Sequence, residues 1–277
     1  MEAVAVVMEH PQVAANLEQV LAGITRAAGE GAQLVVLPEM WPTSFTPGVQ
    51  DSLLEESQAA VATVAGEGAR LGLLVAGTAY GPRAAGGKPT NRLHLFDGGR
   101  DLLAYDKVHL FSPTAEPASF AAGRRPCPVV STAIGRVAGM TCYDLRFPEL
   151  TRAALRDGVE LLVVPAQWPV PRVMHWRRLL AARAIDGLCF IAAANRSGTA
   201  VIGRRELELE FPGEACILSP DGEVLDSVGP EGGLASSELD LAEVKRLRRQ
   251  LPLRKDERPG LYADWLPGPG GGDEGPA

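Results

Sequence analysis

The sequence predicts an α/β fold, a four-layer α-β-β-α sandwich made of two related halves. Strand-like and helix-like segments alternate along most of the 277 residues. The strand-like segments are continuous apolar runs, which is typical of strands buried on both faces. The order strand, helix, strand, helix, strand, hairpin also occurs twice. Two sheets that each carry helices on one face bury their bare faces by packing against each other, so the repeat predicts a sandwich.

The first half contains the first copy of this order. Apolar residues recur at helical spacing from Val13 to Ile24, and Pro38 ends the second apolar run. Asp97-Gly98-Gly99-Arg100 is a strong hairpin signal. The expected elements are strands over residues 4–8, 33–37 and 73–80, helices over 13–24 and 53–70, and hairpin strands over 93–96 and 102–105.

The second half repeats the pattern. Residues 158–165 (GVELLVVP) match residues 31–38 (GAQLVVLP), and residues 185–192 match residues 71–77 after a helix. The expected elements are strands over residues 136–141 and 158–165, a helix over 148–156 that begins with Pro148, a further strand within 185–192, and a hairpin on Pro220-Asp221-Gly222. We therefore expect one domain over residues 1–266. The Gly/Pro-rich tail 267–277 is expected to be disordered.

Composition and charge exclude several classes of function. The chain is 46% hydrophobic and 22% charged, as in ordinary globular proteins, and its net charge of -7 disfavours nucleic acid and anionic membranes as partners. No apolar stretch reaches the ~18 residues of a membrane span, and the strand-like start of the sequence leads us to expect no leader peptide. Four widely spaced cysteines without a CxxC pair indicate reduced thiols and a cytoplasmic protein.

Three residues at predicted strand ends are candidates for catalysis. Glu39 follows a buried strand, where poor solvation favours proton transfer near neutral pH. Cys142 follows strand 136–141, where we expect an exposed turn and helix-end amides that favour thiolate. Lys107 ends the strand that begins at Leu102. Each also has a structural reading: a surface ion pair for Glu39, a buried cysteine for Cys142, and a pair with Asp106 for Lys107.

The internal repeat favours the catalytic reading of Glu39. The position that matches it in the second half is Ala166, so the fold does not require an acid at this strand end. The structural reading is retained for the other three cysteines, which are Cys127, Cys189 and Cys216.

Three sequence blocks resemble the signatures of the nitrilase superfamily, in order and in spacing. They are residues 37–39 (Leu-Pro-Glu), 105–111 (Tyr-Asp-Lys-Val-His-Leu-Phe) and 142–149 (Cys-Tyr-Asp-Leu-Arg-Phe-Pro-Glu). The resemblance covers about residues 1–240. It implies the α-β-β-α sandwich, a Glu–Lys–Cys catalytic set, no cofactor or metal, and a homodimer or a larger homo-oligomer.

The resemblance also implies a role for each catalytic residue. Glu39 takes the proton of the Cys142 thiol, which attacks the carbonyl of a small-molecule amide and forms a thioester. Lys107 and the backbone N–H of Tyr143 stabilise the oxyanion. Glu116 matches a second glutamate that the family carries between the lysine and the cysteine, and it would orient Lys107.

Further matches resemble the omega-amidase branch, which hydrolyses 2-oxoglutaramate. They are residues 166–172 (Ala-Gln-Trp-Pro-Val-Pro-Arg), 179–185 and 195–198 (Asn-Arg-Ser-Gly). A carboxylate-bearing substrate needs a cation in its pocket, for which Arg172 and Arg196 are candidates, with Trp168 as an apolar wall. Residues 203–210 are more charged than the corresponding segment of that branch, so a deaminated glutathione amidase and an N-carbamoyl amine amidohydrolase remain alternatives.

Other classes of protein remain as rivals. A cysteine–histidine hydrolase would use one of four histidines, which are His10, His94, His109 and His175. A metal hydrolase is disfavoured, because no HxH or HExxH motif and no Cys/His pairing is present. A non-catalytic binding protein on the same fold is disfavoured by the presence of all three catalytic residue types. A glutaminase module would lack room for its synthetase.

Overall fold

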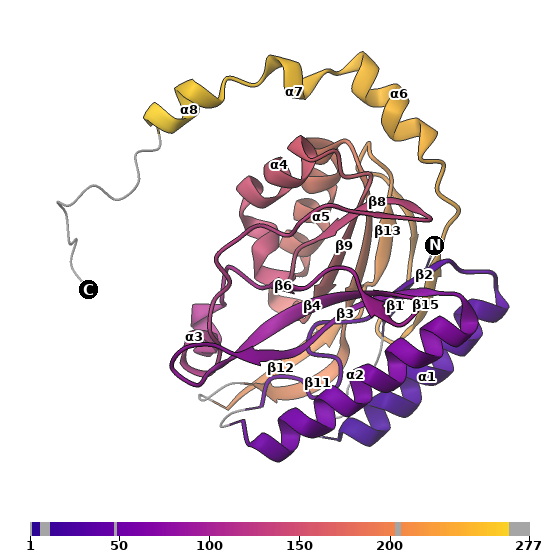
Figure 1. Cartoon of the computed structure of the whole chain (residues 1–277), viewed down its shortest axis with the longest axis vertical. Helices are drawn as coiled ribbons and strands as arrows, with labels where there is room; N and C mark the ends of the chain where they lie inside the picture. The colour runs from indigo at the N-terminus through magenta and orange to yellow at the C-terminus, as the bar shows by residue number, and fades with distance from the viewer. Residues whose placement is uncertain (1, 6–11, 47–48, 203–205, 266–277) are drawn as a thin grey trace.

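Two sheets lie face to face between two pairs of helices in the computed structural model (Figure 1), which describes residues 2–5, 12–46, 49–202 and 206–265. The first sheet has the order β15-β1-β2-β3-β4-β5, with β6 paired to β4. Its strands are β1 (Glu2–Ala5), β2 (Leu34–Val36), β3 (Leu74–Arg83), β4 (Pro89–Asp97), β5 (Arg100–Asp101), β6 (Tyr105–Asp106) and β15 (Gly233–Ser236).

The second sheet has the order β14-β13-β10-β9-β8-β7. Its strands are β7 (Val130–Thr132), β8 (Gly135–Gly139), β9 (Leu161–Ala166), β10 (Phe190–Asn195), β13 (Cys216–Leu218) and β14 (Val224–Ser227). A separate hairpin, β11 (Ser197–Ile202) with β12 (Leu207–Pro212), is inserted between β10 and β13.

The two outer layers are pairs of helices. Helices α1 (Val13–Gly29) and α2 (Asp51–Leu71) cover the first sheet, and α4 (Pro148–Arg156) and α5 (Val173–Gly187) cover the second (Figure 1). The predicted α-β-β-α sandwich is therefore confirmed.

The two halves share one topology, as the sequence repeat predicts. Strands β1, β2 and β3 are parallel and β4 is antiparallel to β3. Strands β8, β9 and β10 are likewise parallel, and β13 is antiparallel to β10. A strand followed by a crossover helix returns parallel to its neighbour, so the repeated sequence pattern produces the same sheet twice.

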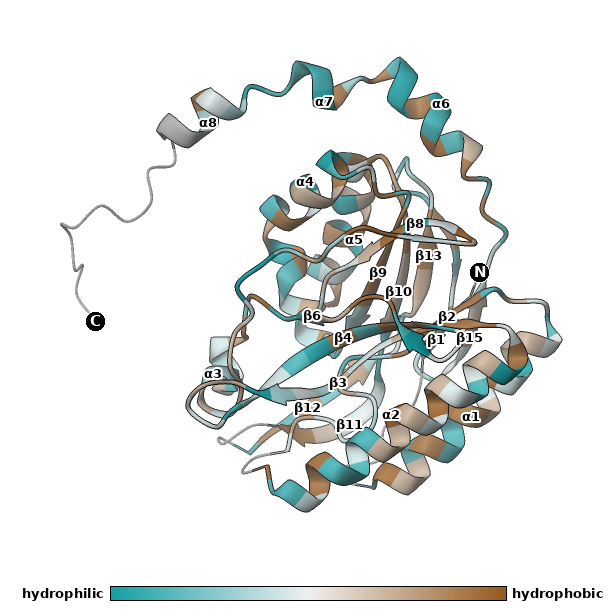
Figure 2. Ribbon diagram, viewed as in Figure 1, coloured by the Kyte–Doolittle hydropathy of each residue, from teal (hydrophilic) through white to brown (hydrophobic). Residues whose placement is uncertain are grey.

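Strand β2 shows why its sequence is apolar at every position. Leu34 and Val36 pack into the cluster between the two sheets, whereas Val35 and Leu37 pack into the cluster under α1 and α2. Successive side chains of a strand point to opposite faces, and here both faces are buried. Figure 2 shows the same pattern as hydrophobic strands at the centre of the molecule.

Two predicted strands differ from the structure. Of the strand expected over residues 102–105, only Tyr105 lies in a strand (β6), and residues 102–104 separate it from β5. The Asp101 carboxylate accepts the Leu103 N–H at 3.2 Å and the Leu95 N–H at 3.3 Å, which interrupts the backbone ladder. Residues 185–187 belong to α5, and the strand expected within 185–192 begins at Phe190. Residues 6–8 of the first predicted strand and the tail 267–277 lie outside the described residues.

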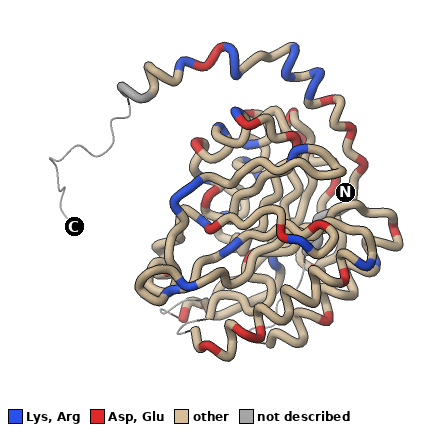
Figure 3. Tube along the Cα trace, in the orientation of Figure 1, with Lys and Arg blue, Asp and Glu red and all other residues tan. Residues whose placement is uncertain are grey.

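A C-terminal arm runs along the outside of the second half (Figure 1). It consists of α6 (Ala242–Gln250), α7 (Leu253–Asp256) and α8 (Pro259–Trp265), and Figure 3 shows charges of both signs along it. Val244 is fully buried in the core, and the Arg248 side chain donates to the carbonyl of Gly187 at 2.9 Å. These two contacts fix α6 to the body.

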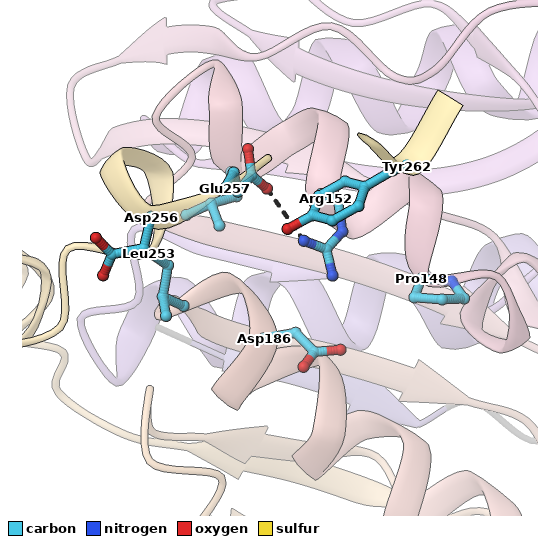
Figure 4. Close-up of a pocket in the computed structure, with 8 residues that line it drawn as sticks. Pro148, Arg152, Asp186, Leu253, Asp256, Glu257 and Tyr262 are labelled. Carbon is cyan, nitrogen blue, oxygen red and sulfur yellow. Dashed lines mark hydrogen bonds and ion pairs between the residues drawn. The ribbon is translucent and has the colours of Figure 1, made fainter. Parts of the chain in front are cut away.

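The far part of the arm contacts α4 through charges. Glu257 accepts hydrogen bonds from Arg152 at 3.1 Å and from Arg156 at 3.0 Å. The Arg152 guanidinium also lies 5.9 Å from the ring centroid of Tyr262. A cavity of about 280 Å³ remains between the arm and α4, as Figure 4 shows. None of the described helices is both long and apolar enough to cross a membrane.

Candidate active site

Four residues that the sequence singles out meet where the two sheets face each other. Glu39 follows β2, Lys107 follows β6, Glu116 begins the short helix α3 (Glu116–Ser119), and Cys142 begins the 3₁₀ helix η2 (Cys142–Arg146). Their exposed fractions are 1%, 1%, 4% and 9%. The carboxyl ends of parallel strands meet at one edge of each sheet, and packing two sheets places both edges side by side.

Lys107 is the cation at the centre of this cluster. Its Nζ donates to Glu39 Oε1 at 2.8 Å, to Glu116 Oε2 at 2.9 Å and to Glu116 Oε1 at 3.0 Å. Burial by itself would lower the pKa of Lys107, but the negative charges of Glu116 and Glu39 outweigh it and hold that pKa well above its ordinary value. The side chain is therefore held as an ammonium, and its charge also acts on the thiol of Cys142.

Gly123 brings the loop after α3 against the lysine strand. Its N–H donates to the Lys107 carbonyl at 2.8 Å, and a Cβ at this position would lie 2.0 Å from the Asp106 carbonyl oxygen. Only glycine allows this approach.

Glu39 has a donor on each carboxylate oxygen. Asn91 Nδ2 and Lys107 Nζ each donate to Oε1 at 2.8 Å, and the backbone N–H of Gln167 donates to Oε2 at 3.1 Å. The Glu39 N–H also faces the Ala166 carbonyl at 3.4 Å, so the two positions that match in the internal repeat lie next to each other. Donors on both oxygens fix the carboxylate in one orientation.

Glu116 closes the cluster on the other side of Lys107. Its Oε2 accepts the Phe111 N–H at 2.5 Å, and Asn91 Nδ2 lies 3.4 Å from its Oε1. Burial raises the pKa of Glu116, Lys107 opposes that shift, and the charge of Glu39 adds to it, so the net direction is upward. Two carboxylates thus share one ammonium in a site with very little exposed surface.

Cys142 is buried, which corrects the expectation of an exposed, thiolate-favouring turn. Burial raises its pKa well above the ordinary value, the negative charge of Glu39 raises it further, and Lys107 opposes the shift. Its Sγ donates to the Gln167 carbonyl at 3.8 Å. The packed sheets cover the turn and leave the thiol next to an anion. The raised pKa favours the neutral thiol of Cys142, and a neutral thiol needs a base before it can act as a nucleophile.

The backbone at Cys142 has a left-handed conformation, with φ of 47°. This conformation is costly for a residue with a side chain, and such strain concentrates at functional sites. The other three cysteines are buried free thiols, and burial raises the pKa of Cys127, Cys189 and Cys216 to about 12 in each case.

Asp144 holds the turn that carries Cys142. Its Oδ2 accepts the Tyr105 hydroxyl at 2.8 Å and the Thr141 N–H at 3.1 Å. Its Oδ1 accepts the backbone N–H of His109 at 2.9 Å and contacts His109 Nδ1 at 2.9 Å. This buried carboxylate therefore ties the cysteine turn to the lysine segment.

The placement of His109 disfavours a cysteine–histidine pair. Its ring stacks on Phe147 with centroids 3.5 Å apart, and its Nδ1 is taken by Asp144. Elsewhere in the described part of the chain, His94 contacts Asp101 and His175 contacts Arg146.

The four residues predicted to bind substrate lie in different surroundings. Tyr143 is half-buried and packs edge-on against Phe111 at 5.0 Å. Trp168 is buried, and the Arg146 guanidinium lies 5.0 Å from its ring centroid. Arg172 is exposed in η3 (Val170–Arg172). Arg196 has no exposed surface, which does not fit direct contact with a substrate carboxylate in this conformation.

Two residues of the site received no role from the sequence, although Gln167 lies within the matching block 166–172. Asn91 lies in β4 and bridges Glu39 and Glu116, and Gln167 follows β9 and contacts both Glu39 and Cys142. An amide side chain in a strand or loop has many structural uses, so residue type and spacing did not mark either one.

Comparison with known proteins places this geometry in a family. The model of the carbon-nitrogen hydrolase family matches residues 3–249. The chain is 32% identical over 240 residues to the 2-oxoglutaramate amidase of Bacillus subtilis (strain 168), covering 83% of this chain and 87% of that protein. It is also 32% identical over 257 residues to the deaminated glutathione amidase of Synechocystis sp. (strain PCC 6803 / GT-S), covering 87% and 92%.

Comparison with solved structures leads to the same family. A cysteine-to-alanine mutant of the Nesterenkonia AN1 amidase, from the nitrilase superfamily, superposes with a TM-score of 0.83 at 27% identity and covers 96% of each chain. Another structure of that amidase shows Michael addition of acrylamide at its active-site cysteine, with a TM-score of 0.81, 27% identity and coverage of 96% and 98%. This chain belongs to the carbon–nitrogen hydrolase family and is an amidase of the nitrilase superfamily.

Proposed function

We propose that the chain hydrolyses a small linear amide through a Cys142 thioester, with Glu39 as base and Lys107 and Glu116 as its electrostatic partners. One observation carries the proposal. A permanent ammonium is held between two buried carboxylates beside a protonated thiol, with one carboxylate fixed by three donors. An ion-pair cluster that only stabilises the fold does not require a thiol beside it, so the presence of Cys142 favours a catalytic role for the cluster.

Acylation begins when Glu39 takes the Cys142 proton and Sγ bonds to the amide carbonyl carbon. The carbonyl oxygen becomes an oxyanion, which Lys107 Nζ and the Tyr143 N–H stabilise. Glu39 then gives its proton to the amide nitrogen, the carbon–nitrogen bond breaks, and ammonia leaves.

Deacylation uses the same residues. Glu39 takes a proton from water, the hydroxyl oxygen bonds to the thioester carbon, and the carbon–sulfur bond breaks. The proton returns to Sγ and the carboxylic acid product leaves. Glu116 does not meet the substrate in this scheme. It keeps Lys107 charged and directed, because an ammonium with a single carboxylate partner would be pulled toward Glu39.

The preferred substrate in this proposal is an amide that bears a carboxylate, of the kind represented by 2-oxoglutaramate. Its support is the resemblance to an amidase of that name, together with Arg172, which lies exposed beside Phe111 with its guanidinium 5.9 Å from the ring centroid. Trp168 supplies the apolar wall. A deaminated glutathione amidase is equally similar in sequence, so its substrate is the second candidate.

The assembly and the setting of the enzyme extend the proposal. A homodimer is supported by exposed apolar side chains on α5 and β14 of the second half, which are Met174 (45%), Ile185 (49%), Val224 (58%) and Leu225 (42%). One domain over residues 1–266 is supported by the shared core between the sheets. A cytoplasmic setting is supported by four buried, unpaired thiols.

Ammonia release from a panel of amides tests the proposal. We expect 2-oxoglutaramate to exceed deaminated glutathione, N-carbamoyl amines and simple aliphatic amides in kcat/KM. Cys142→Ala should lose turnover on every substrate, and mass spectrometry of quenched wild-type enzyme should find an acyl adduct on Cys142. Turnover by a folded Cys142→Ala enzyme would refute the nucleophile, and a preference for another amide would refute the substrate.

A further inference from the structure

Arg196 lies behind the catalytic cluster and has no exposed surface. It follows β10, and its Nη1 donates to Ser44 Oγ at 2.9 Å and lies 3.3 Å from Gln167 Oε1. Its guanidinium also stacks over Phe211 of the β11–β12 hairpin, 4.7 Å from the ring centroid. Moving a charged guanidinium out of water costs free energy, so the burial of Arg196 calls for a functional explanation.

The Arg196 guanidinium decides which way the Gln167 amide faces. A guanidinium only donates hydrogen bonds, so the oxygen of the Gln167 amide must face it. The amide nitrogen then faces the opposite way, where Nε2 donates to the Glu39 backbone carbonyl at 2.8 Å. Ser44 Oγ, 3.2 Å from Gln167 Oε1, supports the same orientation. A flipped amide would place two donors against each other on one side and two oxygens on the other.

Gln167 in turn contacts both reacting groups. Its backbone N–H donates to Glu39 Oε2 at 3.1 Å, its side chain holds the Glu39 carbonyl, and its own carbonyl accepts the Cys142 thiol at 3.8 Å. The Gln167 side chain thus ties the backbone of Glu39 to the residue whose own backbone contacts the Glu39 carboxylate and the Cys142 thiol, and this tie holds the base in place relative to the nucleophile. Since reacting atoms must be held closely, an error of about 1 Å costs on the order of 10²-fold in rate.

We propose that Arg196 is a positioning residue, which acts through the Gln167 side chain to align Glu39 with Cys142. This inference rests on the roles proposed for Glu39 and Cys142. It replaces the role in carboxylate binding that the sequence predicts for Arg196, because its hydrogen bonds face Ser44 and Gln167 and its surface is closed.

A double-mutant cycle with two substrates tests the inference. Arg196→Met, Gln167→Met and the double mutant are compared on 2-oxoglutaramate and on an uncharged aliphatic amide of similar length. We expect Arg196→Met to lower kcat by about 10- to 100-fold, as expected for misplaced reacting groups, and equally on both substrates, with KM changed less than about three-fold. In the Gln167→Met background, Arg196→Met should lower kcat by less than a further three-fold or so, because the Gln167 side chain through which Arg196 acts is already gone.

Arg248→Met is the control, since it also removes an arginine that donates to backbone carbonyls, but one that is half-buried and holds the C-terminal arm. It should leave kcat unchanged. Where Arg196→Met does not fold, Arg196→Gln carries the same test, because a neutral amide can present either a donor or an acceptor to Gln167 and so does not fix its orientation. Thermal unfolding identifies folded variants.

Three outcomes would overturn the inference. The first is that Arg196→Met lowers kcat by the same factor in the Gln167→Met background as in the wild type. The second is an unchanged kcat in a folded Arg196 variant, and the third is a rise in KM confined to the carboxylate-bearing amide. An active Cys142→Ala enzyme would instead remove the proposed function itself, so the two failures are distinguishable.

Discussion

The active site and the C-terminal arm each contain a cluster of three charges, with the signs reversed between the two clusters. In the site, one cation, Lys107, lies between two anions, Glu39 and Glu116. On the arm, one anion, Glu257, lies between two cations, Arg152 and Arg156. The side chains of the first cluster are 1% exposed, whereas the two arginines of the second are 49% and 44% exposed.

The difference in burial gives the two clusters different consequences. Taking charges out of water is expensive, and removing one partner of a buried pair leaves an uncompensated charge, at a cost of about 3–5 kcal/mol. Exposed pairs are screened and contribute about 0–1 kcal/mol. The buried cluster is thus a poor way to stabilise a fold but a good way to hold charge ready for a reaction. The arm cluster is a weak attachment.

The largest expected effect comes from neutralising one anion of the buried cluster. Glu39→Gln keeps the shape of the side chain but removes the base, so single-turnover acylation should slow by about 10²–10⁴-fold. Stability should change little, because Lys107 keeps Glu116 as its partner. Rapid-quench measurement of the acyl-enzyme with a chemical denaturation curve checks both. An unchanged acylation rate would exclude Glu39 as the base.

Removing the central cation should affect both rate and stability. Lys107→Met is expected to lower kcat by about 10²–10³-fold and to reduce the free energy of unfolding by about 3–5 kcal/mol. Losing Lys107 also removes the influence that lowers the pKa of Glu116, so that pKa rises further. The variant should therefore recover stability as the pH falls from about 7 toward the ordinary carboxyl value of 4.5, because the folded state then takes up protons. Urea denaturation at both pH values measures this. Equal destabilisation at both would contradict it.

The two clusters should respond to acid in opposite ways. Burial acts to raise the pKa of Glu257, but Arg156 and Arg152 lower it more and hold it below its ordinary value of 4.5. Its pairs are thus fully present above pH 4.5 and are lost as the pH falls through the lower folded value. The pKa of Glu116 is raised, so acidification through 4.5 does not act against the fold at that residue. As the pH is lowered below 4.5, hydrogen-exchange protection should be lost in α7 and α8 before it is lost in β2 and β9. Simultaneous loss of protection would refute the distinction.

The smallest effect is expected on the arm at neutral pH. Arg152→Met leaves Glu257 paired with Arg156, so the free energy of unfolding should fall by less than about 1 kcal/mol and kcat should not change. It is the matched counterpart of Lys107→Met, since each variant removes one cation. A comparable loss of stability in both variants would mean that burial does not determine how much each cluster contributes to the free energy of unfolding.

Much of the fold was accessible from sequence because its signals are local. Apolar runs, helical spacing and turn residues recur in the same order, and the structure has two sheets of one topology. The split between β5 and β6 was not accessible, since it depends on the Asp101 carboxylate reaching the backbone of residues on both sides of a turn.

The sequence by itself determined which residue types stand at the strand ends, and it marked Glu39 as an addition because the matching position is Ala166. Only the tertiary structure decided how those residues are held. Asn91 and Gln167 enter the site, Arg196 is buried behind it, and Cys142 is covered rather than exposed. These facts depend on hydrogen bonds and burial between segments from both halves, which exist only after the two sheets have packed. Spacing along the chain carries no record of them.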